Sequence, residues 1–143
     1  MSAENKDLVR YIVNELFNCK RTELVSILYA PDCEGSCPDG PYSGREGFRA
    51  FFENYRSAFP DFQLDINYMV AEDDRVIVHY TFTGTSASLL QGRKVRIPGI
   101  MVNRIANNRI VEQSLIWDNL GPRRQIWLAT VAERQMRPDP VAA

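Results

Sequence analysis

Hydrophobic residues recur every three or four positions at the start of the chain, and this spacing predicts helices. The first amphipathic segment covers residues 8–17, with apolar side chains on one face and polar side chains on the other. A second, shorter helix is predicted over residues 22–29, because an apolar cluster there is followed at once by Pro31. Residues 32–36 are expected to form a short strand before a turn rich in proline and glycine.

The third predicted helix has the clearest start signal. Ser43 and Glu46 stand at the spacing of a capping box, in which the two side chains bind free amide groups of the first turn. Pro60 ends the helix. Aromatic residues recur along one side of it and are interpreted as core, or in a hollow fold also as a cavity wall: Phe48, Phe51, Phe52, Tyr55 and Phe59.

After this helix the apolar positions alternate, which is the pattern of strands. Four strands are predicted, over residues 62–70, 76–86, 94–105 and 110–118. Pro98-Gly99 interrupts the third, and because proline cannot donate to a sheet ladder, we expect an edge or a bulge there. Helices followed by a bent antiparallel meander predict an α+β domain, in which a strongly curved sheet wraps over the helices as a cone with an interior pocket.

We expect one domain over residues 1–133 and a disordered tail over residues 134–143, with Pro122 in the first turn of a last helix. The chain has 143 residues, of which 45% are hydrophobic and 24% charged, and its formal net charge is −1. This balance gives no electrostatic reason to bind nucleic acid or an anionic membrane. The N-terminus is polar and acidic, unlike a signal peptide, so a cytoplasmic location is predicted.

The cysteines and the single histidine do not have the spacing of metal ligands. Cys33 and Cys37 would lie roughly 13 Å apart on one strand, too far for a disulfide, although in a loop they could meet. We therefore expect no metal site and three reduced thiols, Cys19, Cys33 and Cys37.

The last predicted strand ends in a carboxylate, Asp118, set among Ile116, Trp117 and Leu120. A carboxylate in apolar surroundings is costly to ionise, so its pKa rises toward neutrality, where it both gives and takes a proton. The pattern favours Asp118 as a general acid/base that acts next to a carbonyl or on an epoxide. The alternative is that Asp118 caps the helix predicted to follow it.

Other polar residues are candidates to assist Asp118. His79, in mid-strand, would polarise a carbonyl or pass a proton, or else is structural. Asn103 and Arg104 have opposite strand parities, so without a bulge only one points inward, where it would stabilise an oxyanion. Arg104 is equally suited to pair with a carboxylate at the surface. Three tyrosines are candidate hydroxyl donors or simply packing residues: Tyr55, Tyr68 and Tyr80.

A cavity beside Asp118 would have apolar walls, which suit a hydrophobic, ring-forming substrate. We expect these walls to be built by Phe48, Phe52, Tyr55, Val102, Ile116 and Trp117.

Four segments resemble the SnoaL-like polyketide cyclases of the nuclear transport factor 2-like superfamily. They are Gly44–Phe48, Ala58–Phe62, Asp74–Thr85 and Asn108–Glu112, with Asp118 six residues after Glu112. The resemblance covers roughly residues 5 to 130. It implies a cone-shaped fold, a homodimer or larger assembly, an apolar cavity and no metal or organic cofactor. It also implies that Asp118 is the general acid/base of an intramolecular aldol closure of a polyketide ester.

Two positions depart from the family pattern. Ser86 stands where a histidine is often found, and Ser114 stands where a tryptophan is usual. Both changes alter the polarity and shape of the pocket, and they affect the expected substrate more than the role of Asp118.

Three functions remain open from the sequence. The first is a cyclase or isomerase of natural-product biosynthesis that closes a ring by aldol reaction or epoxide opening. The second is a non-catalytic module that binds a small hydrophobic ligand. The third is a cofactor-independent hydroxylase. A carboxylate next to Trp117 on an apolar strand favours an enzyme.

Overall fold

The computed structural model describes residues 2–87 and 92–118. Its helical segments are α1 (Ser2–Tyr11), the π-helical segment η1 (Ile12–Asn18) that continues it, the 3-10 turn η2 (Thr22–Leu24), α2 (Val25–Leu28) and α3 (Gly44–Ala58). Its strands are β1 (Tyr29–Cys37), β2 (Gly40–Ser43), β3 (Gln63–Glu72), β4 (Arg75–Thr85), β5 (Lys94–Ala106) and β6 (Arg109–Trp117). The predicted helices and strands within these ranges are confirmed, and β2 lies where the sequence predicts a turn.

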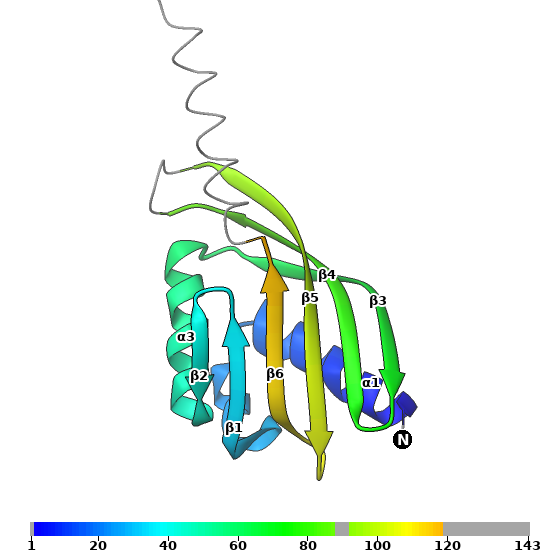
Figure 1. The fold of residues 1–143 in the computed structure, drawn as a ribbon. Coiled ribbons are helices and arrows are strands. Elements are labelled where there is room, and N and C mark those ends of the chain that lie inside the picture. The colour runs from blue at the N-terminus through cyan, green and yellow to red at the C-terminus, as the bar shows by residue number, and fades with distance from the viewer. Residues whose placement is uncertain (1, 88–91, 119–143) are drawn as a thin grey trace, which may run out of the picture.

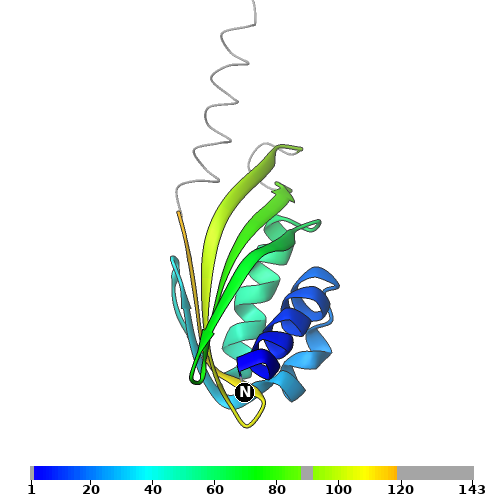
Figure 2. The ribbon, with the colours of Figure 1, turned by 90° about the vertical axis from the view of Figure 1, so that its right-hand side faces the viewer.

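The six strands form one curved, unclosed sheet in the order β2-β1-β6-β5-β4-β3. The helices lie on its concave side (Figures 1 and 2). Neighbouring strands are antiparallel except β1 and β6, which run parallel with Ser36 opposite Ser114. The expected α+β fold, with a curved sheet over the helices, is confirmed, and the meander of β3, β4, β5 and β6 is antiparallel as predicted. In addition, β1 joins the last strand of the meander in parallel.

The alternation along β4 and β5 shows why this sequence curves around a core. Val76, Val78 and Tyr80 are at most 2% exposed, whereas Ile77 between them is 40% exposed. In β5, Met101 is fully buried on the same concave side. Burying each side chain of this size stabilises the fold by about 1.5–3 kcal/mol. Because these side chains lie on the concave face, the helices pack against that face.

The bulge expected at Pro98-Gly99 is not formed toward β4. The pairing of β4 with β5 runs without a shift from Arg75 opposite Arg104 to Thr85 opposite Lys94. Gly99 instead makes room for a neighbour, because a Cβ at this position would lie 2.4 Å from the ring of Tyr80. Glycine is therefore required at position 99, because the Tyr80 side chain crosses β5 there.

The capping box expected before α3 is also not formed. Ser43 Oγ donates to Glu34 Oε2 at 2.8 Å, because the two residues are paired across β2 and β1. The Glu46 carboxylate accepts instead from Arg49. Gly44, with a φ of +71°, turns the chain from strand into helix. The sequence predicts the start of α3 correctly, but the predicted capping interaction is wrong.

The Phe-Pro-Asp element after α3 ties the helix to the end of β4. Asp61 accepts two hydrogen bonds of 2.7 Å from Thr85, one from the backbone N–H and one from the hydroxyl. Phe59 packs over Gly84, where a Cβ would lie 3.1 Å from the Phe59 side chain. This element therefore has a structural role at one end of the cone.

The predicted turn at Asn107-Asn108 is confirmed, since both residues have a positive φ, 53° and 58°, as in tight hairpins. The three cysteines are free thiols. The predicted last helix, the tail and the boundary at residue 133 lie outside the described residues. Within the part that the structure describes, no helix is long and apolar enough to cross a bilayer.

Candidate active site

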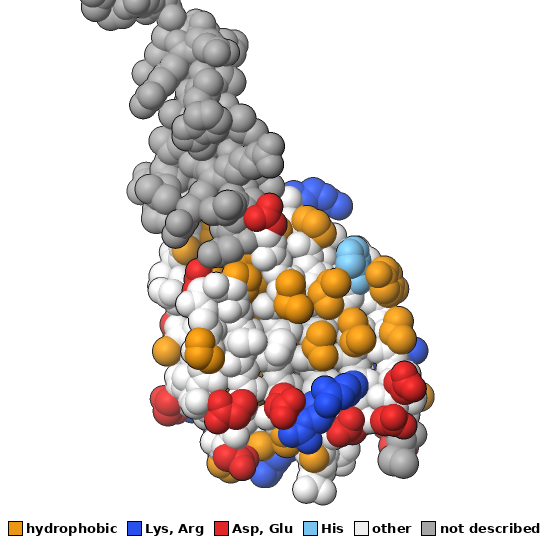
Figure 3. Space-filling view, viewed as in Figure 1, with side chains coloured by type: hydrophobic (Ala, Val, Ile, Leu, Met, Phe, Trp, Pro, Cys, Tyr) orange, Lys and Arg blue, Asp and Glu red, His pale blue; other side chains and the backbone are white. Residues whose placement is uncertain are grey.

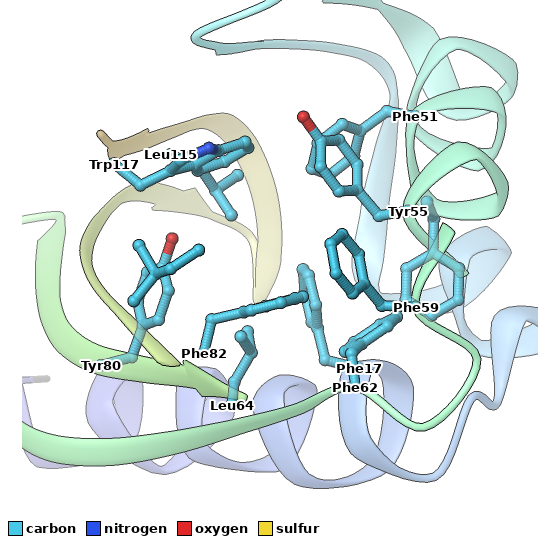
Figure 4. A pocket seen from close by; sticks show the side chains of 12 residues that line it. Phe17, Phe51, Tyr55, Phe59, Phe62, Leu64, Tyr80, Phe82, Leu115 and Trp117 are labelled. Atoms are coloured by element: carbon cyan, nitrogen blue, oxygen red, sulfur yellow. The ribbon is translucent and has the colours of Figure 1, made fainter. Parts of the chain in front are cut away.

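An apolar pocket lies between the helices and the concave face of the sheet (Figure 4). Nine of its twelve lining residues are aromatic, and none of the twelve carries a charge. Its cavity volume is about 50 Å³. Ligand sites are commonly about 300–1,000 Å³, so the wall must open for a substrate with several rings. The lining residues are Phe17, Phe51, Phe52, Tyr55, Phe59, Phe62, Leu64, Tyr80, Phe82, Ile97, Leu115 and Trp117.

Two of the lining residues are tyrosines, but almost all of the accessible pocket surface is apolar. Tyr55, from α3, donates its hydroxyl proton to the Asp39 carboxylate in the turn between β1 and β2. Tyr80, from β4, reaches across Gly99 and points toward Trp117 (Figure 4). Burial raises the pKa of both hydroxyls above their ordinary value, and the hydrogen bond to Asp39 adds to the rise at Tyr55. Both groups are therefore neutral hydrogen-bonding groups near neutral pH.

The pocket wall is held by contacts among its rings and by one cation. Phe62 and Phe82 stack with ring centroids 5.7 Å apart, and Tyr55 meets Trp117 edge to face at 5.3 Å. Lys20 Nζ lies 3.6 Å from the centroid of the Phe62 ring and donates to the Phe62 carbonyl oxygen at 2.6 Å. Lys20 therefore fixes both the ring and the backbone of Phe62.

We expect the free energy of unfolding to rise with pH because of the titration of Lys20. Burial, and after it the charge of Arg56, lower the pKa of Lys20 from 10.5 to about 8. Between these pH values the unfolded chain binds more protons than the folded chain, so the free energy of unfolding increases as pH rises through this window. Urea unfolding below pH 8 and again at about pH 10 measures the effect. From the lower to the higher pH, the free energy of unfolding of wild type should increase relative to that of Lys20→Met. A difference between the two proteins that is the same at both pH values would contradict the prediction.

Four of the predicted site residues line the pocket: Phe52, Tyr55, Tyr80 and Trp117. Phe48 does not line it. Its side chain is fully buried and its ring centroid lies 4.4 Å from that of Tyr29, so Phe48 is part of the core behind the wall.

Five predicted site residues lie on the convex face of the sheet, away from the pocket. Ile116 is 57% exposed, whereas Leu115 and Trp117 on either side of it line the pocket. The expectation that Ile116 and Trp117 share a wall is wrong, because neighbours on a strand face opposite sides. His79 stacks on Tyr68 on the convex face, with ring centroids 4.9 Å apart. The five are Tyr68, His79, Val102, Ser114 and Ile116.

Asn103 and Arg104 point to opposite sides, as their parity predicts. Arg104 donates to Glu112 at 2.8 Å on the convex face, which matches its alternative interpretation as a surface partner. Asn103 is fully buried, and its Oδ1 accepts from Gln113 Nε2 at 2.8 Å. The Tyr29 hydroxyl in turn donates to Gln113 Oε1 at 2.9 Å. Neither amide lines the pocket, so the network stabilises the core.

Asn103→Ala is expected to cost about 1–3 kcal/mol of stability, because the buried Gln113 amide loses its oxygen acceptor and keeps only the weak Met101 sulfur at 3.7 Å. Urea unfolding measures this loss. Gln113→Leu and the double variant complete a double-mutant cycle, in which the two losses should be clearly less than additive. Additive losses would mean that the two amides do not act together. If Asn103 is structural only, the folded variant keeps its activity.

Asp118 directly follows Trp117 at the end of β6, and it is exposed. The described residues do not form the apolar enclosure expected around its carboxylate. Leu120, and the helix that Asp118 was alternatively expected to cap, lie outside them. Asp118 is thus an exposed carboxylate one residue from the pocket wall. Within the described ranges, no three Asp, Glu, His or Cys side chains gather where they could hold a metal ion.

The sequence did not predict several residues in or next to the pocket. Phe82 and Leu115 could have been found from parity, since they share a strand face with Tyr80 and Trp117 respectively. Asp39 had no such signal, because its contact with Tyr55 joins a turn to a helix.

Three candidate cyclases are among the solved structures that share the fold. The first is a candidate SnoaL-like polyketide cyclase from Jannaschia sp. CCS1, 18% identical over 87% of this chain and 92% of that chain, with a TM-score of 0.80. The second is a candidate polyketide cyclase from Acidithiobacillus ferrooxidans, 22% identical over 90% and 98%, with a TM-score of 0.79. The third is IdmH, a candidate polyketide cyclase from Streptomyces antibioticus, 25% identical over 85% and 97%, with a TM-score of 0.76.

A comparison with curated proteins gives no match. The family model of the SnoaL-like polyketide cyclases, in contrast, matches residues 7–126, which include the second half of α1, the helices α2 and α3, the strands β1 to β6 and Asp118. The chain therefore belongs to the SnoaL-like polyketide cyclase family.

Proposed function

We propose that the chain is a cofactor-independent cyclase or isomerase that closes a ring in a hydrophobic, polyketide-type intermediate of natural-product biosynthesis. The observation that carries this proposal is the pocket of nine aromatic residues, two of them with hydroxyls, one residue away from a carboxylate. Such a pocket holds a flexible apolar chain close to the geometry of reaction. In well-ordered intramolecular reactions this lowers a barrier by up to about 7–11 kcal/mol. Membership of the family supports the same class of activity.

In the proposed reaction the Asp118 carboxylate removes a proton from the carbon next to a substrate carbonyl, and the electron pair moves onto the carbonyl oxygen as an enolate. The enolate carbon attacks a second carbonyl of the same molecule and forms the new carbon–carbon bond. The resulting alkoxide takes the proton from Asp118. The product is an isomer of the substrate, so the step needs no oxidant, reductant or leaving group.

The place of Asp118 suits a substrate whose apolar part fills the pocket while its reacting carbonyls lie at the end of β6. Closure by epoxide opening would use the same carboxylate. Asp118 would then take the proton of the attacking hydroxyl and return it to the oxygen of the opened epoxide.

The experiment is incubation of the purified protein, without added cofactor, with bicyclic aromatic methyl esters that carry a β-diketone side chain. Liquid chromatography and mass spectrometry should show a new product of unchanged mass. Binding without any product would favour the non-catalytic module. A gain of one oxygen atom with consumption of O2 would indicate a hydroxylase. Either of these two outcomes would contradict the proposal.

We also propose that the convex face of the sheet pairs with a second copy of the chain. Large exposed apolar side chains gather on this face, across β3, β4, β5 and β6 (Figure 3): Tyr68, Val70, Ile77, Ile100 and Ile116. A contiguous apolar patch of this kind marks an interface, and a two-fold axis lets one patch serve both copies. Sedimentation equilibrium measures the mass in solution, and a monomer would contradict this proposal.

A further inference from the structure

The partly exposed residues of the pocket wall show where the pocket meets the solvent. Eight of the twelve lining residues are buried, whereas Phe51, Tyr55, Phe82 and Trp117 are partly exposed. Three of these rings form a row from α3 to β6 (Figure 4). The centroid of the Tyr55 ring lies 5.2 Å from that of Phe51 and 5.3 Å from that of Trp117. Tyr55 therefore stands in the middle of the pocket mouth.

Two of the rings at the mouth are held in place by further aromatic rings. Phe82 stacks on Phe62 at 5.7 Å and meets Phe59 edge to face at 5.3 Å, between centroids. Phe51 stacks on Tyr42 at 5.2 Å, with the ring planes 13° apart. An outward movement of Phe82 or Phe51 would break these contacts, so neither ring is suited to open the pocket.

Tyr55, in contrast, is held by a polar contact at the surface. Its hydroxyl donates to the carboxylate of Asp39, an exposed residue in the turn between β1 and β2. Water solvates both groups when this bond breaks, so the bond favours the closed position of the ring by only about 3- to 10-fold. Within the described residues, Trp117 makes its ring contact with Tyr55 alone. Closure of the mouth therefore depends on the position of Tyr55.

We propose that Tyr55 is the gate of the pocket and that its hydrogen bond to Asp39 keeps this gate closed. The cavity of about 50 Å³ is too small for a substrate with several rings, so the ligand binds when the Tyr55 ring has rotated away from Trp117. The apparent dissociation constant is the intrinsic constant divided by the fraction of open molecules. Removal of the bond to Asp39 raises this fraction and should tighten binding. The inference rests on the proposed function, since it takes the pocket as the substrate site.

The test is an NMR titration with naphthalene, a fused-ring hydrocarbon that has no hydrogen-bonding group. Nuclear Overhauser effects between the probe and the methyl groups of Leu115, which is buried and lines the pocket, verify where it binds. The variants are Asp39→Ala, Tyr55→Phe and the double variant. Asp32→Ala is the matched control, because Asp32 is an exposed aspartate on β1 that does not line the pocket. Thermal unfolding verifies that each variant is folded.

Asp39→Ala should bind naphthalene about 3- to 10-fold more tightly than wild type, because its pocket is open more often. Tyr55→Phe should also bind more tightly. Adding Asp39→Ala to Tyr55→Phe should have no further effect, since the two residues act through one bond. Asp32→Ala should bind as wild type does. Loss of a contact that only supports the wall, or that binds the ligand, would weaken binding instead.

Three results would overturn the inference, and they are distinguishable. If Asp39→Ala binds naphthalene no more tightly than wild type, the bond does not keep the pocket closed, and the proposed function is unaffected. A gain that persists in the Tyr55→Phe background would assign the effect to another contact of Asp39. If neither wild type nor any variant binds naphthalene beside Leu115, the pocket does not open to fused rings, and the proposed function fails together with the inference.

Discussion

Asp118→Asn is expected to lower the rate of ring closure by about 10²–10⁴-fold, which is the usual contribution of a general acid/base. Asparagine keeps the shape of the side chain but cannot take the proton from carbon or return it to the alkoxide. The initial rate of product formation measures the effect, with the methyl ester that wild type converts. Thermal unfolding of the variant verifies that it is folded.

Asp65→Asn is the matched control for this variant. Asp65 is an exposed aspartate on β3 that does not line the pocket, so its replacement should leave the rate unchanged. Full activity in Asp118→Asn would assign the proton transfer to another group. The Asp39 carboxylate, bound to the pocket residue Tyr55, would then be the next to replace.

Phe48→Ala is expected to cost about 3–5 kcal/mol of stability. The Phe48 side chain is fully buried, and its ring lies 4.4 Å from that of Tyr29 and 5.9 Å from those of Phe17 and Tyr42, measured between centroids. Alanine leaves a cavity where helix α3 meets β1, and these neighbours cannot collapse into it without losing their own contacts. Chemical unfolding monitored by circular dichroism measures the loss.

Ile116→Ala provides the comparison for Phe48→Ala. Ile116 is also a large apolar residue, but it is 57% exposed on the convex face. Its truncation should change the free energy of unfolding of the monomer by about 0.5 kcal/mol or less. Similar losses in the two variants would contradict the assignment of Phe48 to the core and of Ile116 to the surface.

The helices and the long strands could be predicted because their apolar residues repeat with a single period. In the predicted strand 76–86 apolar residues stand at every second position from Val76 to Phe82, and β4 covers nearly the same residues. β2 was missed because Gly40 and Pro41 are typical of turns, and the strand forms through pairing with β1, which the local sequence does not encode. The parallel contact of β1 with β6 was missed for the same reason, since nothing near Ser36 specifies Ser114.

The aromatic part of the site could be predicted better than its polar part. Phe52 and Tyr55 follow from the helical stripe of α3, and Tyr80 and Trp117 were placed correctly at the pocket. The sequence suggests His79 as a site residue because histidine is a common catalytic residue. However, His79 lies two residues from Ile77 on β4, so both side chains face the side of the sheet opposite to Tyr80. The hydrogen bond of Tyr55 to Asp39 and the crossing of Tyr80 over Gly99 join parts of the chain that only folding brings together.

The parallel pairing of β1 with β6 also bears on the order in which the domain forms. β3, β4, β5 and β6 follow one another as neighbouring hairpins, so their pairing closes only short loops. β1, in contrast, pairs with a strand about 80 residues later in the chain, as in the contact of Ser36 with Ser114. Contacts of such long sequence separation slow folding. We therefore expect the meander to assemble first and the Tyr29–Gln113 contact to form late in folding.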